Sequence, residues 1–88
     1  MQRGIEKLDL KFEPSMKLLT RILMVILKQN SLGKTHLSQE SNVNYVRLTR
    51  CLDWLEKKSL VKFVIKDGKT HVQLSQQGRE FTMMLSSL

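Results

Sequence analysis

The chain has 88 residues and a mass of 10.3 kDa, which is room for one compact domain and excludes a multidomain enzyme. Hydrophobic residues make up 41% and charged residues 26%, a balance typical of a folded globular chain and not of a disordered one. Lysine and arginine number 15 against 8 acidic residues, so the formal net charge is +7 and the pI about 9.9. Such an excess favours a polyanionic partner, with nucleic acid ahead of an anionic membrane surface.

The positive charge is concentrated in the second half of the chain. Residues 41–79 hold eight Lys or Arg against three acids, whereas residues 1–13 are balanced. The longest apolar run, Ile22–Leu27, has six residues. A membrane span needs about 20 apolar residues, and the apolar region of a signal peptide has about 7 to 15. We therefore expect a cytoplasmic protein whose binding surface lies within residues 41–79.

The first part of the chain predicts an arm followed by a helix. Residues 1–14 alternate loosely between apolar and polar and close at Pro14, which disfavours helix at the residue before it, so we interpret them as an N-terminal arm or short strand. Ser15 suits an N-cap, and the apolar residues that follow recur at helical spacing, which predicts a helix over Ser15–Gln29. The apolar arc of this helix is wider than one packing face requires, so part of it is expected to meet another subunit.

Two further helices are predicted on either side of a short turn. The first runs over about Thr35–Ser41, with Thr35 as its N-cap. The second runs over about Asn44–Lys58, where apolar residues return every three or four positions. Arg47 and Arg50 lie one turn apart on its outer side. Two short helices arranged in this way are the elements of a helix-turn-helix.

The next segment predicts a β-hairpin. Val61–Lys66 and Thr70–Ser75 alternate between apolar and polar residues, with Ile65 among those expected to face inward. Asp67 and Gly68 join the two runs, and this dipeptide favours a two-residue type I′ turn, which needs a positive φ at both positions. The hairpin therefore presents lysines at its tip.

A last helix is predicted to follow Ser75, which suits its N-cap. Its apolar residues form one stripe at spacings of three and four. Together with the wide apolar arc of the first helix, this stripe predicts a homodimer, because two half-sites raise the specificity of a DNA-binding protein. The expected dimer-interface residues are Phe81, Met84, Leu85 and Leu88.

This order of elements is that of the winged helix-turn-helix, and particular segments extend the likeness. Gly33–Leu37, Leu52–Lys58 and Leu74–Phe81 resemble the winged-helix domain of small archaeal predicted transcriptional regulators. The resemblance covers roughly residues 15–85. It implies an α+β fold for residues 15–88, with three helices, a two-stranded wing and a C-terminal helix, and it implies a DNA-binding, nucleoid-associated regulator.

Ser59 departs from the pattern of such regulators. It stands where they usually have glycine, at the end of the recognition helix. If the backbone there is left-handed, a residue other than glycine costs on the order of 1 kcal/mol.

The outer face of the third helix supplies the candidates for reading bases. A helix about 10 to 12 Å across fits the major groove of B-DNA, which is about 12 Å wide. Arg47 and Arg50 are expected to read bases, because the guanidinium fork can donate two bonds to guanine. Asn44 is suited equally to an adenine edge or phosphate and to capping its own helix. Tyr45 either offers its hydroxyl to a phosphate or packs as a core tyrosine.

Three lysines are expected to contact the DNA backbone. Lys66 and Lys69 lie at the hairpin tip, and Lys34 lies at the start of the second helix. Such contacts add affinity without sequence information. Lysines at strand ends also protect sheet edges from pairing, so ordinary protection is as good an explanation for the two wing residues.

The remaining reactive side chains do not form a catalytic or metal site. Cys51 faces inward on its helix, where a free cysteine behaves as a small hydrophobe. His36 and His71 lack a second ligand or an acid at useful spacing. Trp54 is expected to cover an edge of the domain. We expect no enzyme, no cofactor and no metal.

The basic face has possible partners other than DNA. A winged helix used for protein contact, without DNA, is the main alternative, because fold does not fix function. The charge on the third helix and hairpin argues against it, since an interaction module has no general need for such a cluster. RNA binding is weakened by the small number of aromatic residues, five in all. Membrane attachment is weaker still, because the most apolar helix carries few basic residues. Double-stranded DNA is the expected partner.

Overall fold

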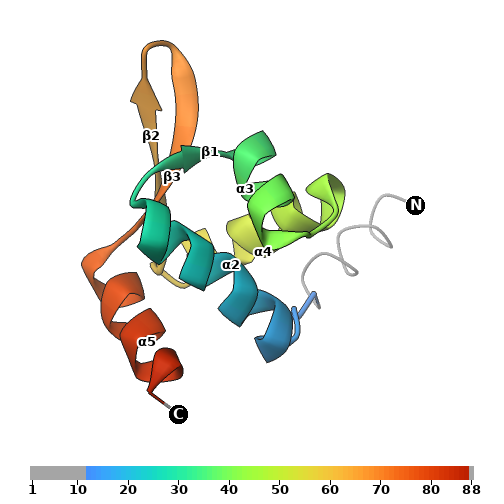
Figure 1. Cartoon of the computed structure of the whole chain (residues 1–88), viewed down its shortest axis with the longest axis vertical. Helices are drawn as coiled ribbons and strands as arrows, with labels where there is room; N and C mark the ends of the chain where they lie inside the picture. The colour runs from blue at the N-terminus through green and yellow to red at the C-terminus, as the bar shows by residue number, and fades with distance from the viewer. Residues whose placement is uncertain (1–11, 88) are drawn as a thin grey trace.

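The computed structural model describes residues 12–87 of the chain, in which the helices lie at one end of a small antiparallel sheet and its hairpin projects away from them (Figure 1). The fold is α+β, and the order of its elements is that of a winged helix-turn-helix, as predicted. In chain order the described elements are α2 (Met16–Gln29), β1 (Leu32–Gly33), α3 (Lys34–Ser41), α4 (Tyr45–Lys57), β2 (Val61–Lys66), β3 (Lys69–Leu74) and α5 (Gln76–Ser86). Residues 1–11 of the expected arm and Leu88 lie outside the described part.

Side-chain caps set the starts of three helices. Ser15 accepts a hydrogen bond from the Leu18 N–H at the start of α2, and Ser75 accepts one from the Gly78 N–H at the start of α5, as predicted. The prediction of Thr35 as the cap of α3 is wrong. Gly33 occupies that position, because β1 holds it extended against β3 and the helix starts directly after it.

The sheet has the order β1-β3-β2, and the two-residue strand β1 was not predicted from the sequence. In the hairpin, Lys66 pairs with Lys69 across the turn, so β3 begins one residue earlier than predicted. Asp67 and Gly68 have φ values of 52° and 76°, which confirms the positive φ expected of this turn. The turn chemistry therefore fixes the register of the wing.

The core lies where α2, α3 and α4 meet the lower part of the sheet. Its fully buried residues come from each of these elements, and Cys51 is among them, as predicted. The hairpin projects beyond this core, on the side of the molecule away from α5 (Figure 1). The prediction that Ile65 faces inward is wrong, since 69% of its surface is exposed. Ile65 lies on the same face of β2 as Val61 and Phe63, but it is so far along the hairpin that no core residues cover it.

A tight corner fastens α5 to the chain that leads into the wing. The Ser75 hydroxyl donates to the Ser59 carbonyl at 2.6 Å, and the Ser75 N–H donates to the Leu60 carbonyl at 3.0 Å. Gly78 packs against the same peptide so closely that an added Cβ would lie 1.8 Å from the Leu60 oxygen. Ser59 has a φ of 64°, so this non-glycine residue does adopt the left-handed conformation.

Among residues 12–87, no helix is both long and apolar enough to span a lipid bilayer.

Candidate nucleic-acid interface

The turn between α3 and α4 is held by an arginine from α2. Arg21 donates from Nη2 to the carbonyl oxygens of Ser41 and Asn42, each at 2.8 Å. These carbonyls lie at the C-terminal end of α3, where a cation is favoured both by the unpaired acceptors and by the helix dipole. Arg21 therefore fixes the angle at which α4 leaves the turn, a role that its place on the polar face of α2 did not predict.

Replacing Arg21 with alanine is expected to lower the free energy of unfolding by about 2 kcal/mol, because two charge-assisted hydrogen bonds are lost and one of them, to Ser41, is partly buried. Urea unfolding followed by circular dichroism measures the change. Lys17→Ala, on the same face of α2 but with no such bonds described, is the matched control and is expected to change stability by less than about 0.5 kcal/mol. Equal effects of the two substitutions would contradict the role of Arg21.

The outer face of α4 is a stripe of exposed side chains opposite the core. Val46, Arg50, Asp53 and Lys57 follow one another at spacings of four, three and four, and all are exposed. Arg47 is exposed on the flank of this stripe, where it lines a shallow groove with Arg21 and the turn. Both arginines predicted to read bases are thus at the surface, and because they are three residues apart they are neighbours on the helix.

Asn44 caps α4. Its Oδ1 accepts from the N–H groups of Val46 at 2.9 Å and Arg47 at 3.3 Å. Of the two roles open at the sequence level, capping is therefore present in the structure. The amide nitrogen of Asn44 is the part that remains for a contact outside the chain.

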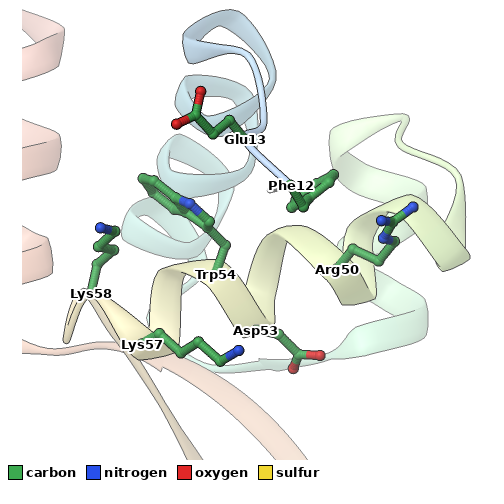
Figure 2. Close-up of a pocket in the computed structure, with 7 residues that line it drawn as sticks. All are labelled: Phe12, Glu13, Arg50, Asp53, Trp54, Lys57 and Lys58. Carbon is green, nitrogen blue, oxygen red and sulfur yellow. The ribbon is translucent and has the colours of Figure 1, made fainter. Parts of the chain in front are cut away.

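Arg50 lies at the edge of an aromatic and basic pocket (Figure 2). Its guanidinium carbon is 4.6 Å from the centre of the Phe12 ring. Trp54 is half-buried on the same side of α4, and Lys58 covers its ring with Nζ at 5.3 Å from the centre. Asp53 also lines this pocket, so an acidic side chain lies among its cations. Sequence reasoning placed Trp54 at an edge of the domain but missed the ring of Phe12 beside Arg50.

A second groove, of about 520 Å³, lies between the start of α3, the start of α4 and strand β3. Lys34, Tyr45 and Lys69 line it, together with both histidines of the chain. Tyr45 is 49% exposed, so the core alternative for this residue is excluded. Lys34 extends toward the wing, with Nζ 4.9 Å from the centre of the Phe63 ring. The groove therefore gathers three of the predicted contact residues from three different elements.

Every residue at the tip of the wing from Ile65 to Thr70 is exposed. Lys66 and Lys69 are direct cross-strand partners there, which places their two charges side by side. Like charges in this arrangement repel each other and destabilise the hairpin slightly. An anion bound between them would relieve that repulsion.

The reactive groups of the described chain give little chemistry of their own. Burial raises the pKa of the Cys51 thiol, while the cations of Arg47 and Arg50 pull in the opposite direction. His36 lies 3.5 Å from the carboxylate of Glu40, one turn along α3, so the prediction that it lacks an acid at useful spacing is wrong. Within residues 12–87 no three potential metal ligands among His, Cys, Asp and Glu gather in one place.

The residues expected at a dimer interface are only partly covered in one chain. Met84 is 63% exposed, whereas Phe81 and Leu85 are half-buried against the core. Leu88, the fourth of them, lies outside the described residues.

The fold defined by these elements is the winged helix-turn-helix found in MarR-family regulators. The sequence matches no protein-family model, and a search of curated proteins also gave no match. Solved structures do match. A MarR-family transcriptional regulator from Silicibacter pomeroyi is 25% identical with a TM-score of 0.69, and the match covers 77% of this chain and 49% of that one.

Two other solved structures have the same fold. A MarR family protein from Bacillus stearothermophilus is 21% identical with a TM-score of 0.75, over 98% of this chain and 60% of that one. A DNA-binding protein from Sulfolobus solfataricus is 18% identical with a TM-score of 0.65, over 77% of this chain and 74% of that one. The chain thus spans about half to three fifths of the length of the two MarR-family proteins.

Proposed function

We propose that this protein is a DNA-binding transcriptional regulator, or a more general chromosome-binding protein, that inserts α4 into the major groove and lays the wing on the flanking backbone. The observation that carries the proposal is the set of exposed cations on these two elements. Arg47 and Arg50 lie on α4, and Lys66 and Lys69 lie at the wing tip. A surplus of positive charge in this one part of the fold matches the charge of DNA.

The local geometry supports this mode of binding. The start of α4 lies beside β3 across the groove lined by Tyr45 and Lys69, so a duplex against α4 also reaches the wing. Lys34, at the first turn of α3, adds a cation where the helix dipole already favours a phosphate. Asn44 contributes its amide nitrogen at the start of α4. These residues position the backbone, and the two arginines supply the base contacts.

The solved relatives support the same class of function. The Silicibacter protein is described as a transcriptional regulator and the Sulfolobus protein as DNA-binding, and neither is described as an enzyme. The Sulfolobus match agrees with the resemblance to small archaeal regulators. As such a regulator, the protein is proposed to act in the cytoplasm in association with the nucleoid. The proposal involves no catalysis.

The protein is further proposed to act as a homodimer through α5, with Phe81, Met84, Leu85 and Leu88 at the contact. The exposed thioether of Met84 beside two half-buried apolar residues supports this surface. Sedimentation velocity at micromolar concentration is expected to give twice the monomer mass. A species of 10.3 kDa alone would contradict the dimer.

The wing lysines give the first test of the DNA-binding mode. The double substitution Lys66→Ala/Lys69→Ala is expected to reduce the slope of log K against log salt concentration by about 2, because each phosphate contact contributes about 0.9. Fluorescence anisotropy of a labelled duplex at several salt concentrations measures that slope. Lys62→Ala, an exposed lysine near the base of the wing, is the control and is expected to leave the slope nearly unchanged.

If the double variant has the same slope of log K against log salt concentration as the natural protein, the wing does not contact DNA. Absence of DNA binding by the folded natural protein would instead favour the protein-contact alternative.

A further inference from the structure

The most exposed large apolar side chains lie on the two elements proposed to meet DNA. Val46 on α4 is 68% exposed and Ile65 on the wing is 69% exposed, each more than any other large hydrophobic residue that is exposed in residues 12–87. Val46 begins the outer stripe of α4, directly opposite the buried face. The residues that continue the stripe are charged. DNA binding by cations explains the charged residues of this stripe, but it does not explain an apolar residue, Val46, at its start.

Val46 has little conformational freedom to lose on contact. Its backbone N–H donates to Oδ1 of Asn44 at 2.9 Å, which fixes the first turn of the helix. Its branched side chain has one strongly preferred rotamer in a helix, so little conformational freedom is lost when it is covered. Valine is also a poorer helix former than alanine, lysine or glutamate, so helix stability alone does not favour it at an exposed position. The position therefore suits a rigid apolar contact.

The major groove offers one kind of apolar group to such a side chain. All four bases present donors or acceptors there, and thymine alone adds a methyl group, at C5. The first residues of a recognition helix are those that approach the base edges. Arg50, one turn further along the helix, and Arg47 beside it bring the cations that hold a duplex against this part of α4. Thymine is thus the base whose chemistry matches Val46.

We infer that Val46 contacts the C5-methyl group of a thymine in the major groove and so selects a T·A base pair in the recognised sequence. The inference rests on the proposed DNA-binding function and adds a specificity-determining residue to it. A buried methyl group contributes enough free energy to change the dissociation constant about fourfold.

Deoxyuridine tests the inference because it differs from thymidine only by that methyl group. A preferred duplex is first selected from a random pool with the natural protein, and each thymine in it is then replaced singly by deoxyuridine. Anisotropy at fixed salt is expected to show about fourfold weaker binding for one thymine in each half-site. In Val46→Ala, thymidine and deoxyuridine at that position are expected to bind equally well. Thermal unfolding confirms that the variant is folded.

Met24→Ala is the matched control, since it removes an exposed apolar side chain from α2, outside the α4 face. It is expected to keep the full difference between thymidine and deoxyuridine. The inference is overturned if no thymine shows a difference with the natural protein, if the difference persists in Val46→Ala, or if DNA is bound with no preferred sequence. Failure of the natural protein to bind any duplex is a different result, because it contradicts the proposed function itself.

Discussion

Alanine in place of Gly78 is expected to destabilise the protein by about 3 kcal/mol or more, because the new Cβ would be placed against backbone and not against a movable side chain. The Cβ would lie 1.8 Å from the Leu60 oxygen and 2.7 Å from its carbonyl carbon. The Leu60 carbonyl also accepts the Ser75 N–H, so it cannot move without loss of that bond. Either α5 moves away from the core or the entry into the wing distorts.

Thermal unfolding by circular dichroism measures this effect. For a domain of this size, 3 kcal/mol corresponds to a fall in Tm of about 12 to 24 °C. Gly33→Ala is the matched control, because a Cβ at Gly33 would meet only the Thr70 oxygen at 4.0 Å and the φ of Gly33 is negative. Its expected cost is below about 1 kcal/mol. Similar Tm values for the Gly78 variant and the natural protein would show that the corner is looser than described.

The double substitution Arg47→Ala/Arg50→Ala is expected to abolish most sequence-specific binding. Each arginine that reads a base contributes about 2 kcal/mol, so the dissociation constant at the preferred sequence should rise by about three orders of magnitude. Both side chains are exposed on α4, so the fold should tolerate their removal. The loss of the Arg50 contact with Phe12 is expected to cost less than about 1 kcal/mol of stability.

Anisotropy with the selected duplex measures this loss at fixed salt. Lys17→Ala/Arg79→Ala removes the same charge from α2 and α5, outside the proposed interface, and controls for the general effect of net charge. That control is expected to weaken binding by less than about tenfold. If both double variants lose affinity equally, the arginines of α4 act only through charge and do not read bases.

Much of this fold follows from local sequence signals. The wing could be predicted because Asp67 and Gly68 dictate a turn with two positive φ values, and the turn then fixes the pairing of the strands. The starts of α2 and α5 could be predicted from Ser15 and Ser75 because an N-cap side chain bonds only to N–H groups two or three residues further along the chain.

Features that depend on distant parts of the chain were not predictable in this way. Strand β1 is two residues long and exists only because β3 lies beside it. Ile65 obeys the alternation of its strand, but the alternation does not say how far the core extends. The motif that contains Gly78 was visible in the sequence, yet the reason for glycine is its approach to Leu60, 18 residues earlier.

The candidate site shows the same division. The cations of α4 and the wing were predicted from charge and periodicity, and they are exposed. The hydrogen bonds of Arg21 join residues about 20 positions apart, and the ring of Phe12 contacts Arg50 from outside the helix-turn-helix. Neither contact has a local signal in the sequence. Val46 was not among the candidates from the sequence, and its exposed fraction of 68% is what singled it out.

Binding of DNA by the cations of α4, α3 and the wing is measured by the affinity of the natural protein for a random duplex of about three helical turns at a series of salt concentrations. With five cations in contact per protomer, each contributing about 0.9, we expect a slope of log K against log salt of about −4.5 per protomer. Absence of binding at about 50 mM salt by a protein shown to be folded, or a slope near zero, would contradict it.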